Sequence, residues 1–150
     1  MNILSIDPGN IQTAFVVFDG ENILDKGILP NEQMLEYILR KKSDYAVIEM
    51  IASYGMTVGK TVFDTVLWIG RFFEAAHNDK HTSLIYRQDI KMHLCKTTRA
   101  KDSNIRQALI DRFNPELAPG KRPNGILSGF HKDEWAALAV AVTFYDLNLK

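Results

Sequence analysis

The sequence has almost no cysteine and no long apolar run. A single cysteine among 150 residues cannot form an internal disulfide, which fits a reducing compartment. No apolar stretch approaches the roughly 20 residues that a membrane helix needs, and the N-terminus lacks the basic start and apolar stretch of an export signal. We therefore expect one cytoplasmic domain spanning residues 1–150, without membrane association.

Net charge is absent as well, since 18 Lys and Arg balance 18 Asp and Glu. The distribution is nevertheless uneven: residues 1–79 carry six Lys or Arg against eleven Asp or Glu, whereas residues 80–122 carry ten against four. A basic segment within a neutral chain can bind a polyanion, although a solvated helical face has the same composition. Charge alone leaves nucleic-acid binding open.

Apolar segments separated by turn residues predict an α/β domain. We expect three antiparallel strands, then helix, strand, helix, strand and three helices, with helices on both faces of a mixed five-stranded sheet. The predicted strands are residues 2–7, 13–18, 22–29, 44–50 and 82–87. The predicted helices are residues 30–42, 61–78, 87–96, 102–113 and one that begins near His131. Residues 114–130, rich in Pro and Gly, form a loop of a length that is usually functional or disordered.

Asp7 and Glu49 share an unusual setting, because each is the first charged residue at the C-terminal end of an apolar strand. Ligands bind at that edge of open α/β sheets. If the two strands are parallel neighbours, about 4.8 Å apart, both carboxylates can face one ion. Bare carboxylates would repel each other, and Mg²⁺ or Mn²⁺ removes that conflict. Taken singly each acid is more often structural; Asp7, for example, precedes the turn pair Pro8-Gly9.

Residues 131–142, HKDEWAALAVAV, put Asp133 and Glu134 at the start of an alanine-rich helix. Acids there stabilise a helix N-terminus, so capping is the simpler interpretation of either one alone. Combined with the two strand-end acids, they predict a metal site. Ala136 lies one turn after Asp133, on the same helix face.

Two phosphate-loop patterns are weak. Three residues separate Gly55 from Gly59, whereas a P-loop requires four. Residues 7–13 resemble the first phosphate loop of the actin-like and sugar-kinase ATPases, but those proteins bind nucleotide between two domains and this chain is too short for two. We expect no nucleotide cofactor.

The segments described so far resemble the RuvC family of Holliday-junction resolvases, within the ribonuclease H-like superfamily. The opening motif of that family resembles ILSIDPGN, the second motif AVIEM and the last motif DEWAALAVA. The segment that supplies two functional lysines resembles IYRQDIKMHL followed by RAKDSNIRQALI. The resemblance covers nearly the whole chain and is weakest in residues 114–130. It implies a ribonuclease H-like fold and an endonuclease of DNA recombination and repair, in a bacterial or phage-infected cytoplasm. The short chain and neutral overall charge suggest a compact phage or plasmid version.

The resemblance also implies the catalytic residues. Asp7, Glu49 and Asp133 would ligate two Mg²⁺ (or Mn²⁺) ions per active site, one activating a water and the other stabilising the leaving 3′ oxygen. Lys91 and Lys101 would neutralise charge on the scissile phosphate. Either lysine taken singly fits a solvated helix residue equally well.

Ala136 stands where the family has its last acid. We favour an inactivating substitution, because the surrounding motif is otherwise intact. Alternatively, Glu134 or His131 has taken over as ligand, or the chain is a DNA binder that has lost cleavage. A lost ligand predicts severely slowed cleavage with fold and binding retained.

The implied partners are a four-way DNA junction and a second copy of the chain, because symmetric cutting needs two sites related by a two-fold axis. Further DNA contacts are predicted for Lys121 and Arg122 on the Pro/Gly loop, and for Tyr54, which would wedge against a base. Dimer contacts are predicted on the 61–78 helix, although the same residues more often form core: Val66, Trp68, Ile69, Phe72 and Phe73. Two alternatives stay open: a non-catalytic branched-DNA-binding protein, and a ribonuclease H-like nuclease acting on other branched DNA or on RNA.

Overall fold

A computed structural model describes residues 1–150 and contains one mixed sheet of five strands. The strands are β1 (Ile3–Asp7), β2 (Gln12–Phe18), β3 (Ile23–Pro30), β4 (Tyr45–Met50) and β5 (His81–Tyr86). Their order in the sheet is β3-β2-β1-β4-β5. β1, β2 and β3 are antiparallel in succession, and β4 lies parallel between β1 and β5. The predicted mixed sheet with three antiparallel leading strands is confirmed.

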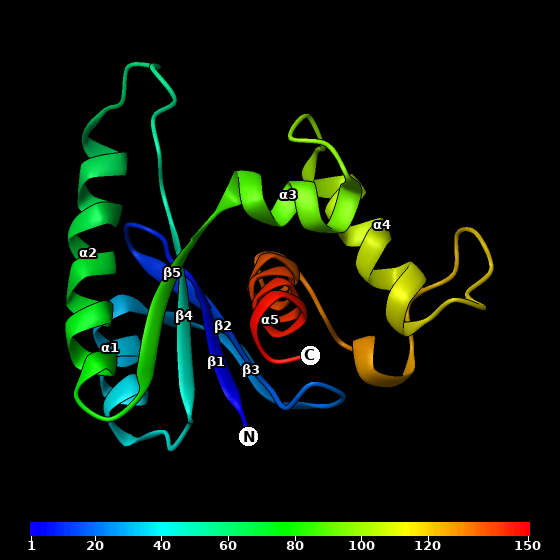
Figure 1. The fold of residues 1–150 in the computed structure, drawn as a ribbon, viewed down its shortest axis with the longest axis horizontal. Coiled ribbons are helices and arrows are strands. Elements are labelled where there is room, and N and C mark those ends of the chain that lie inside the picture. Colours follow the sequence, from blue (N-terminus) through cyan, green and yellow to red (C-terminus); the bar gives the residue numbers. More distant parts are fainter.

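Helices cover both faces of this sheet, as predicted. They are α1 (Asn31–Arg40), α2 (Lys60–His77), α3 (Arg87–Cys95), α4 (Asp102–Phe113) and α5 (Glu134–Asn148). α1 and α2 lie on one face and α5 on the other, with α3 and α4 packed beyond α5 (Figure 1). No helix combines the length and apolar character needed to cross a membrane.

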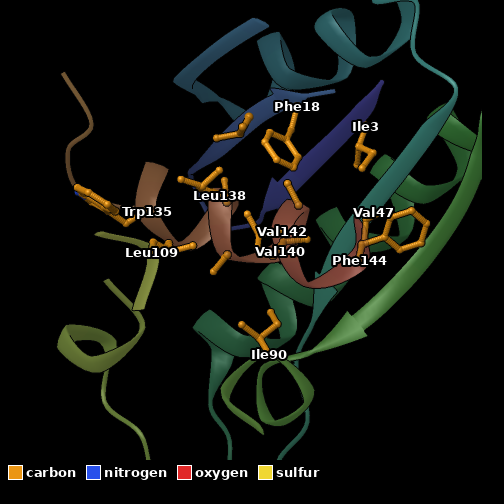
Figure 2. Packing of buried hydrophobic residues seen from close by; sticks show 14 of the residues in the cluster. Ile3, Phe18, Val47, Ile90, Leu109, Trp135, Leu138, Val140, Val142 and Phe144 are labelled. Atoms are coloured by element: carbon orange, nitrogen blue, oxygen red, sulfur yellow. The ribbon is translucent and has the colours of Figure 1, made fainter. Parts of the chain in front are cut away.

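α5 is the centre of the larger core. It is apolar on all sides because the sheet covers one side of it and α3 and α4 cover another, as expected for a buried helix. Small residues let its backbone approach the sheet, so that Ser5 Oγ donates a hydrogen bond of 2.7 Å to the carbonyl oxygen of Ala137. Figure 2 shows the side chains that pack around this helix, among them Ile3, Phe18, Val47, Ile90, Leu109, Leu138, Val140 and Val142.

The second core lies under α1 and α2, and it corrects the predicted dimer contacts. Ile69 and Phe72 are only 3 % and 0 % exposed, because helical periodicity turns them toward the sheet together with Thr65 and Ala76. The dimer contact is therefore wrong for these two residues, and the alternative that they form core against the sheet is confirmed. The remaining predicted contacts are partly buried: Val66, Trp68 and Phe73.

The predicted element boundaries fall close to those in the structure, with two differences around residues 114–133. The last helix begins at Glu134 rather than near His131, because Lys132 has a positive φ of 51° that is incompatible with a helix. The preceding loop also contains a 3₁₀ turn, Gly125–Leu127, whose Leu127 is buried in the larger core.

Candidate active site

The parallel pairing of β1 with β4 brings Asp7 and Glu49 to the same edge of the sheet. Ile6 pairs with Ile48, and the next residue of each strand is the acid. Ile6 and Ile48 both belong to the core under α1 and α2. Because side chains alternate along a strand, both acids face the opposite side, toward α5.

Glu49 is a buried carboxylate with only one of its oxygens occupied. It is 8 % exposed, and its Oε2 accepts a hydrogen bond of 3.2 Å from Arg87 Nε. Oε1 is buried and has no hydrogen-bond partner. Burial raises the pKa of Glu49, against the opposing effect of the Arg87 guanidinium. A buried carboxylate oxygen without a partner is costly, and a bound cation would satisfy it.

Asp7 is held in an acidic environment. The pKa of Asp7 is raised to about 8, first by burial and then by the negative charges of Glu49 and Asp133, while Arg87 acts in the opposite direction. The three acids are therefore electrostatic neighbours. A divalent cation among them would replace mutual repulsion with attraction.

Asp133 and Ala136 line a small cavity beside these strand ends. Asp133 immediately precedes α5 and is exposed, whereas Ala136 is partly buried one turn later. The cavity has a volume of about 70 Å³ and is also lined by Arg87, the residue that binds Glu49. A longer side chain at residue 136 would therefore enter a cavity that Arg87 also lines.

The carboxylate oxygens of Asp7 and Glu49 are donors of the kind that a hard divalent cation prefers, but a third ligand is not in place. With the side chains as they stand, no three carboxylate, imidazole or thiol groups lie close enough together to ligate one ion. Arg87 provides the positive charge at Glu49, and residue 136 contributes no carboxylate. The unpartnered Oε1 of Glu49 and the destabilised charge of Asp7 nevertheless mark two oxygen donors that Mg²⁺ or Mn²⁺ would accept.

The two predicted lysines differ in their relation to these acids. Lys91 on α3 is partly buried, and its positive charge weakly opposes the rise that burial causes in the pKa of Glu49. Lys101 is exposed and immediately precedes α4, where its backbone N–H donates to Asn104 Oδ1 over 2.8 Å. The residue after it, Asp102, binds Arg87.

The two fallback ligands are not brought together with Asp7 and Glu49. Glu134 is 2 % exposed, and its Oε1 accepts hydrogen bonds of 2.9 Å from Lys26 Nζ and 3.1 Å from the His131 backbone N–H. The charge of Glu134 is therefore already neutralised by Lys26, which lies on β3. The His131 ring is largely exposed and lies 3.3 Å from the carbonyl oxygen of Gly129.

The predicted DNA contacts lie in two separate loops. Tyr54 is 52 % exposed in the loop between β4 and α2, which extends beyond the strand ends at the top of Figure 1. Lys121 and Arg122 are exposed in the loop after α4, which projects at the opposite end of the molecule from α2 (Figure 1).

Arg87 and Asp102 are site residues that sequence reasoning missed. Arg87 Nη1 lies 2.7 Å from Asp102 Oδ1 while its Nε binds Glu49. A signal for Arg87 existed, because it is the first charged residue after β5, which is the parallel neighbour of β4. Asp7 and Glu49 were selected as the first charged residues at the ends of apolar strands, and the same criterion selects the cation Arg87.

The fold and the strand-end acids define a class: an α/β domain of the ribonuclease H-like type, with its acids at the carboxyl ends of the central parallel strands. No protein-family model matches the chain, and neither does any curated protein sequence. Among solved structures it is similar to RuvC of Thermus thermophilus, with a TM-score of 0.71 and 17 % identity over 98 % of this chain and 96 % of that one. It is also similar to T. thermophilus RuvC in complex with Holliday junction substrate, with a TM-score of 0.66 and 16 % identity over 95 % and 92 % of the two chains. The expected RuvC-like fold is thereby confirmed.

Proposed function

We propose that the chain is a structure-selective endonuclease of the RuvC type, which binds four-way DNA junctions and hydrolyses phosphodiester bonds. The observation that carries this proposal is the position of Asp7 and Glu49 at the ends of two adjacent parallel strands, with one buried oxygen of Glu49 unpartnered. The similarity to a RuvC structure that contains a Holliday junction supports DNA as the substrate class.

Within this proposal the acids hold two Mg²⁺ or Mn²⁺ ions. Asp7, Glu49 and Asp133 are the residues that would hold these ions. When bound, the ions would supply an activated water and a counter-charge for the leaving 3′ oxygen. Lys91 would neutralise charge on the scissile phosphate, while the exposed Lys101, Lys121 and Arg122 would bind the DNA backbone.

Ala136 leaves this centre short of one carboxylate, so we expect junction binding with severely impaired cleavage. The same observation favours a second candidate, a branched-DNA-binding protein without nuclease activity. The two candidates differ in what happens when the carboxylate is restored.

The test is Ala136→Asp, assayed on a strand-labelled four-way junction with Mg²⁺. Resolution by paired nicks is expected from the single variant, and none from the double variant Asp7→Asn/Ala136→Asp. Tight binding by Ala136→Asp without nicking would instead establish the binding protein. Competition with flap, duplex and RNA-containing substrates then separates a junction resolvase from a nuclease of other branched nucleic acids.

We further propose a homodimer, as symmetric cutting requires. Phe63 and Leu67 support a contact through α2, because they are 64 % and 65 % exposed on the outer side of that helix. Large exposed apolar residues that adjoin one another often mark a protein interface. Light scattering during size-exclusion chromatography tests this, and a monomer at the concentrations used for cleavage would contradict it.

A further inference from the structure

One guanidinium connects two carboxylates from different elements of the site. Arg87 Nε donates to Glu49 Oε2 at 3.2 Å, and Arg87 Nη1 lies 2.7 Å from Asp102 Oδ1. Glu49 is at the end of β4, and Asp102 is the first residue of α4. Arg87 therefore occupies the carboxylate that the proposed metal centre requires, while retaining a second partner outside that centre.

The two contacts are unequal. The contact with Glu49 is the longer one, and it leaves Oε1 without a partner. The contact with Asp102 is shorter, and the Asp102 side chain is 87 % exposed, so it can follow a moving guanidinium. Separation from Glu49 consequently breaks the longer contact and keeps the shorter one.

A guanidinium and a divalent cation compete for the same carboxylate. Both oxygens of Glu49 belong to one carboxylate, and Arg87 binds Oε2. A divalent cation bound to Oε1 would therefore lie close to the Arg87 charge. Like charges at such separations in a partly buried site repel strongly. Arg87 is 29 % exposed and has room to withdraw, because it lines the 70 Å³ cavity next to Ala136.

We propose that Arg87 is an internal counter-ion of the metal centre: it holds Glu49 when no metal is bound and withdraws to Asp102 when a divalent cation binds. This inference rests on the proposed metal centre at Asp7 and Glu49. Arg87 is a positioning residue, which keeps a buried carboxylate ordered and sets the affinity of the centre for its cation.

The test is Mn²⁺ binding measured by isothermal titration calorimetry at pH 8, without DNA. Arg87→Gln is expected to bind Mn²⁺ about tenfold more tightly, because the competing charge is gone. Arg87→Lys retains the charge and should return most of the way to the original affinity. A purely structural role would lower the melting temperature of Arg87→Gln without tightening Mn²⁺ binding.

Arg106→Gln is the matched control. Arg106 lines the same cavity but stacks on Trp135, 4.8 Å from the ring centroid, and makes no contact with Glu49. Its removal should change Mn²⁺ affinity less than about threefold. If Arg87→Gln and Arg106→Gln tighten Mn²⁺ binding equally, the cause is the overall loss of positive charge near the site, and the proposed exchange of partners by Arg87 is overturned.

Asp102→Asn gives a second measurement on an exposed residue whose substitution leaves the cores intact. With its outer partner lost, Arg87 should remain on Glu49 and weaken Mn²⁺ binding. Asp102→Asn should weaken Mn²⁺ binding less when residue 87 is already changed by Arg87→Gln, because both substitutions act through the Arg87 side chain. An unchanged effect in the Arg87→Gln background would overturn the inference.

Asp7→Asn separates the two levels of the proposal. If it abolishes Mn²⁺ binding while Arg87→Gln fails to tighten it, the metal centre stands and the role of Arg87 is overturned. If Asp7→Asn leaves Mn²⁺ binding unchanged, or if no variant binds Mn²⁺, the proposed metal centre fails and the inference fails with it.

Discussion

Lys26 and Glu134 form an ion pair that joins β3 to the first turn of α5, with Nζ 2.9 Å from Oε1. The Glu134 side chain is 3 % exposed, and its Oε1 is surrounded by the Lys26 ammonium, the His131 backbone N–H and the His131 Nδ1 at 3.3 Å. The start of α5, and with it Asp133, is thereby tied to the sheet.

Breaking this pair should destabilise the protein more than removing it altogether. Lys26→Met leaves a buried carboxylate without a counter-charge and should lower the free energy of unfolding by about 2 kcal/mol, a value reduced for the partial exposure of Lys26. Lys26→Met/Glu134→Gln should recover part of that loss. Urea unfolding followed by circular dichroism measures both, and equal loss in the two variants would contradict the pairing.

Asp7 should make the metal-free protein less stable as pH rises. Its native pKa of about 8 lies above the unfolded value of 3.8, so its burial costs nothing below pH 4 and most above pH 8. Asp7→Asn in EDTA should therefore raise the melting temperature by several degrees at pH 8.5 and hardly at all at pH 4. Glu116→Gln, an exposed carboxylate in the loop after α4, is the control and should show no such trend.

Asp146 should behave in the opposite way. Although burial opposes it, hydrogen bonds from Arg112 and His93 lower the pKa of Asp146 below its ordinary value of 3.8. Arg112 Nη2 and His93 Nε2 each lie 2.7 Å from its carboxylate, which joins α3, α4 and α5. The ionised Asp146 carboxylate and its two partners stabilise the fold at pH values above the ordinary pKa of 3.8. This stability is lost as the pH falls through the lowered pKa of Asp146.

We expect Asp146→Asn to lower the free energy of unfolding at pH 7 by about 2 kcal/mol, and by less near pH 2. Chemical denaturation at the two pH values measures the difference. A loss of equal size at both would show that packing, rather than charge, is responsible.

Lys91 should contribute one phosphate contact to DNA binding. Lys91→Gln should weaken junction binding and reduce the slope of log K against log salt by about 0.9. Lys60 is the control, because it pairs with Asp64 on the exposed start of α2. Fluorescence anisotropy across a salt series measures the slopes of Lys91→Gln and Lys60→Gln. Identical changes in the two variants would contradict a phosphate contact by Lys91.

The parts of the fold that follow from local patterns were predictable from the sequence. Strands and helices follow from periodicity, and the shared edge of Asp7 and Glu49 follows from the parallel neighbours that an α/β order requires. The partners of charged side chains were not predictable. Lys26 is 108 residues from Glu134, and nothing in the composition distinguishes that pair from solvated charges. The same applies to Arg87, whose two acids lie on separate elements.

Periodicity also failed to identify the free surface of α2. An apolar helix against a sheet has more apolar residues than the sheet can cover, and the phase of the helix decides which of them are buried. The buried face consists of Ile69 and Phe72 together with Thr65 and Ala76, and the last two are small and carry little hydrophobic signal. Phe63 and Leu67 are exposed for the same reason.

The 3₁₀ turn Gly125–Leu127 affects a residue that it does not touch. Leu127 is 1 % exposed in the core, and Lys26 Nζ bonds the carbonyl oxygen of Gly129 at 3.0 Å. The few residues that remain before Asp133 are therefore fastened at both ends. A cavity-forming change deep in the hydrophobic interior, such as Leu127→Ala, would loosen an acid at the surface, so inactivating substitutions in this protein need not lie among the acids themselves.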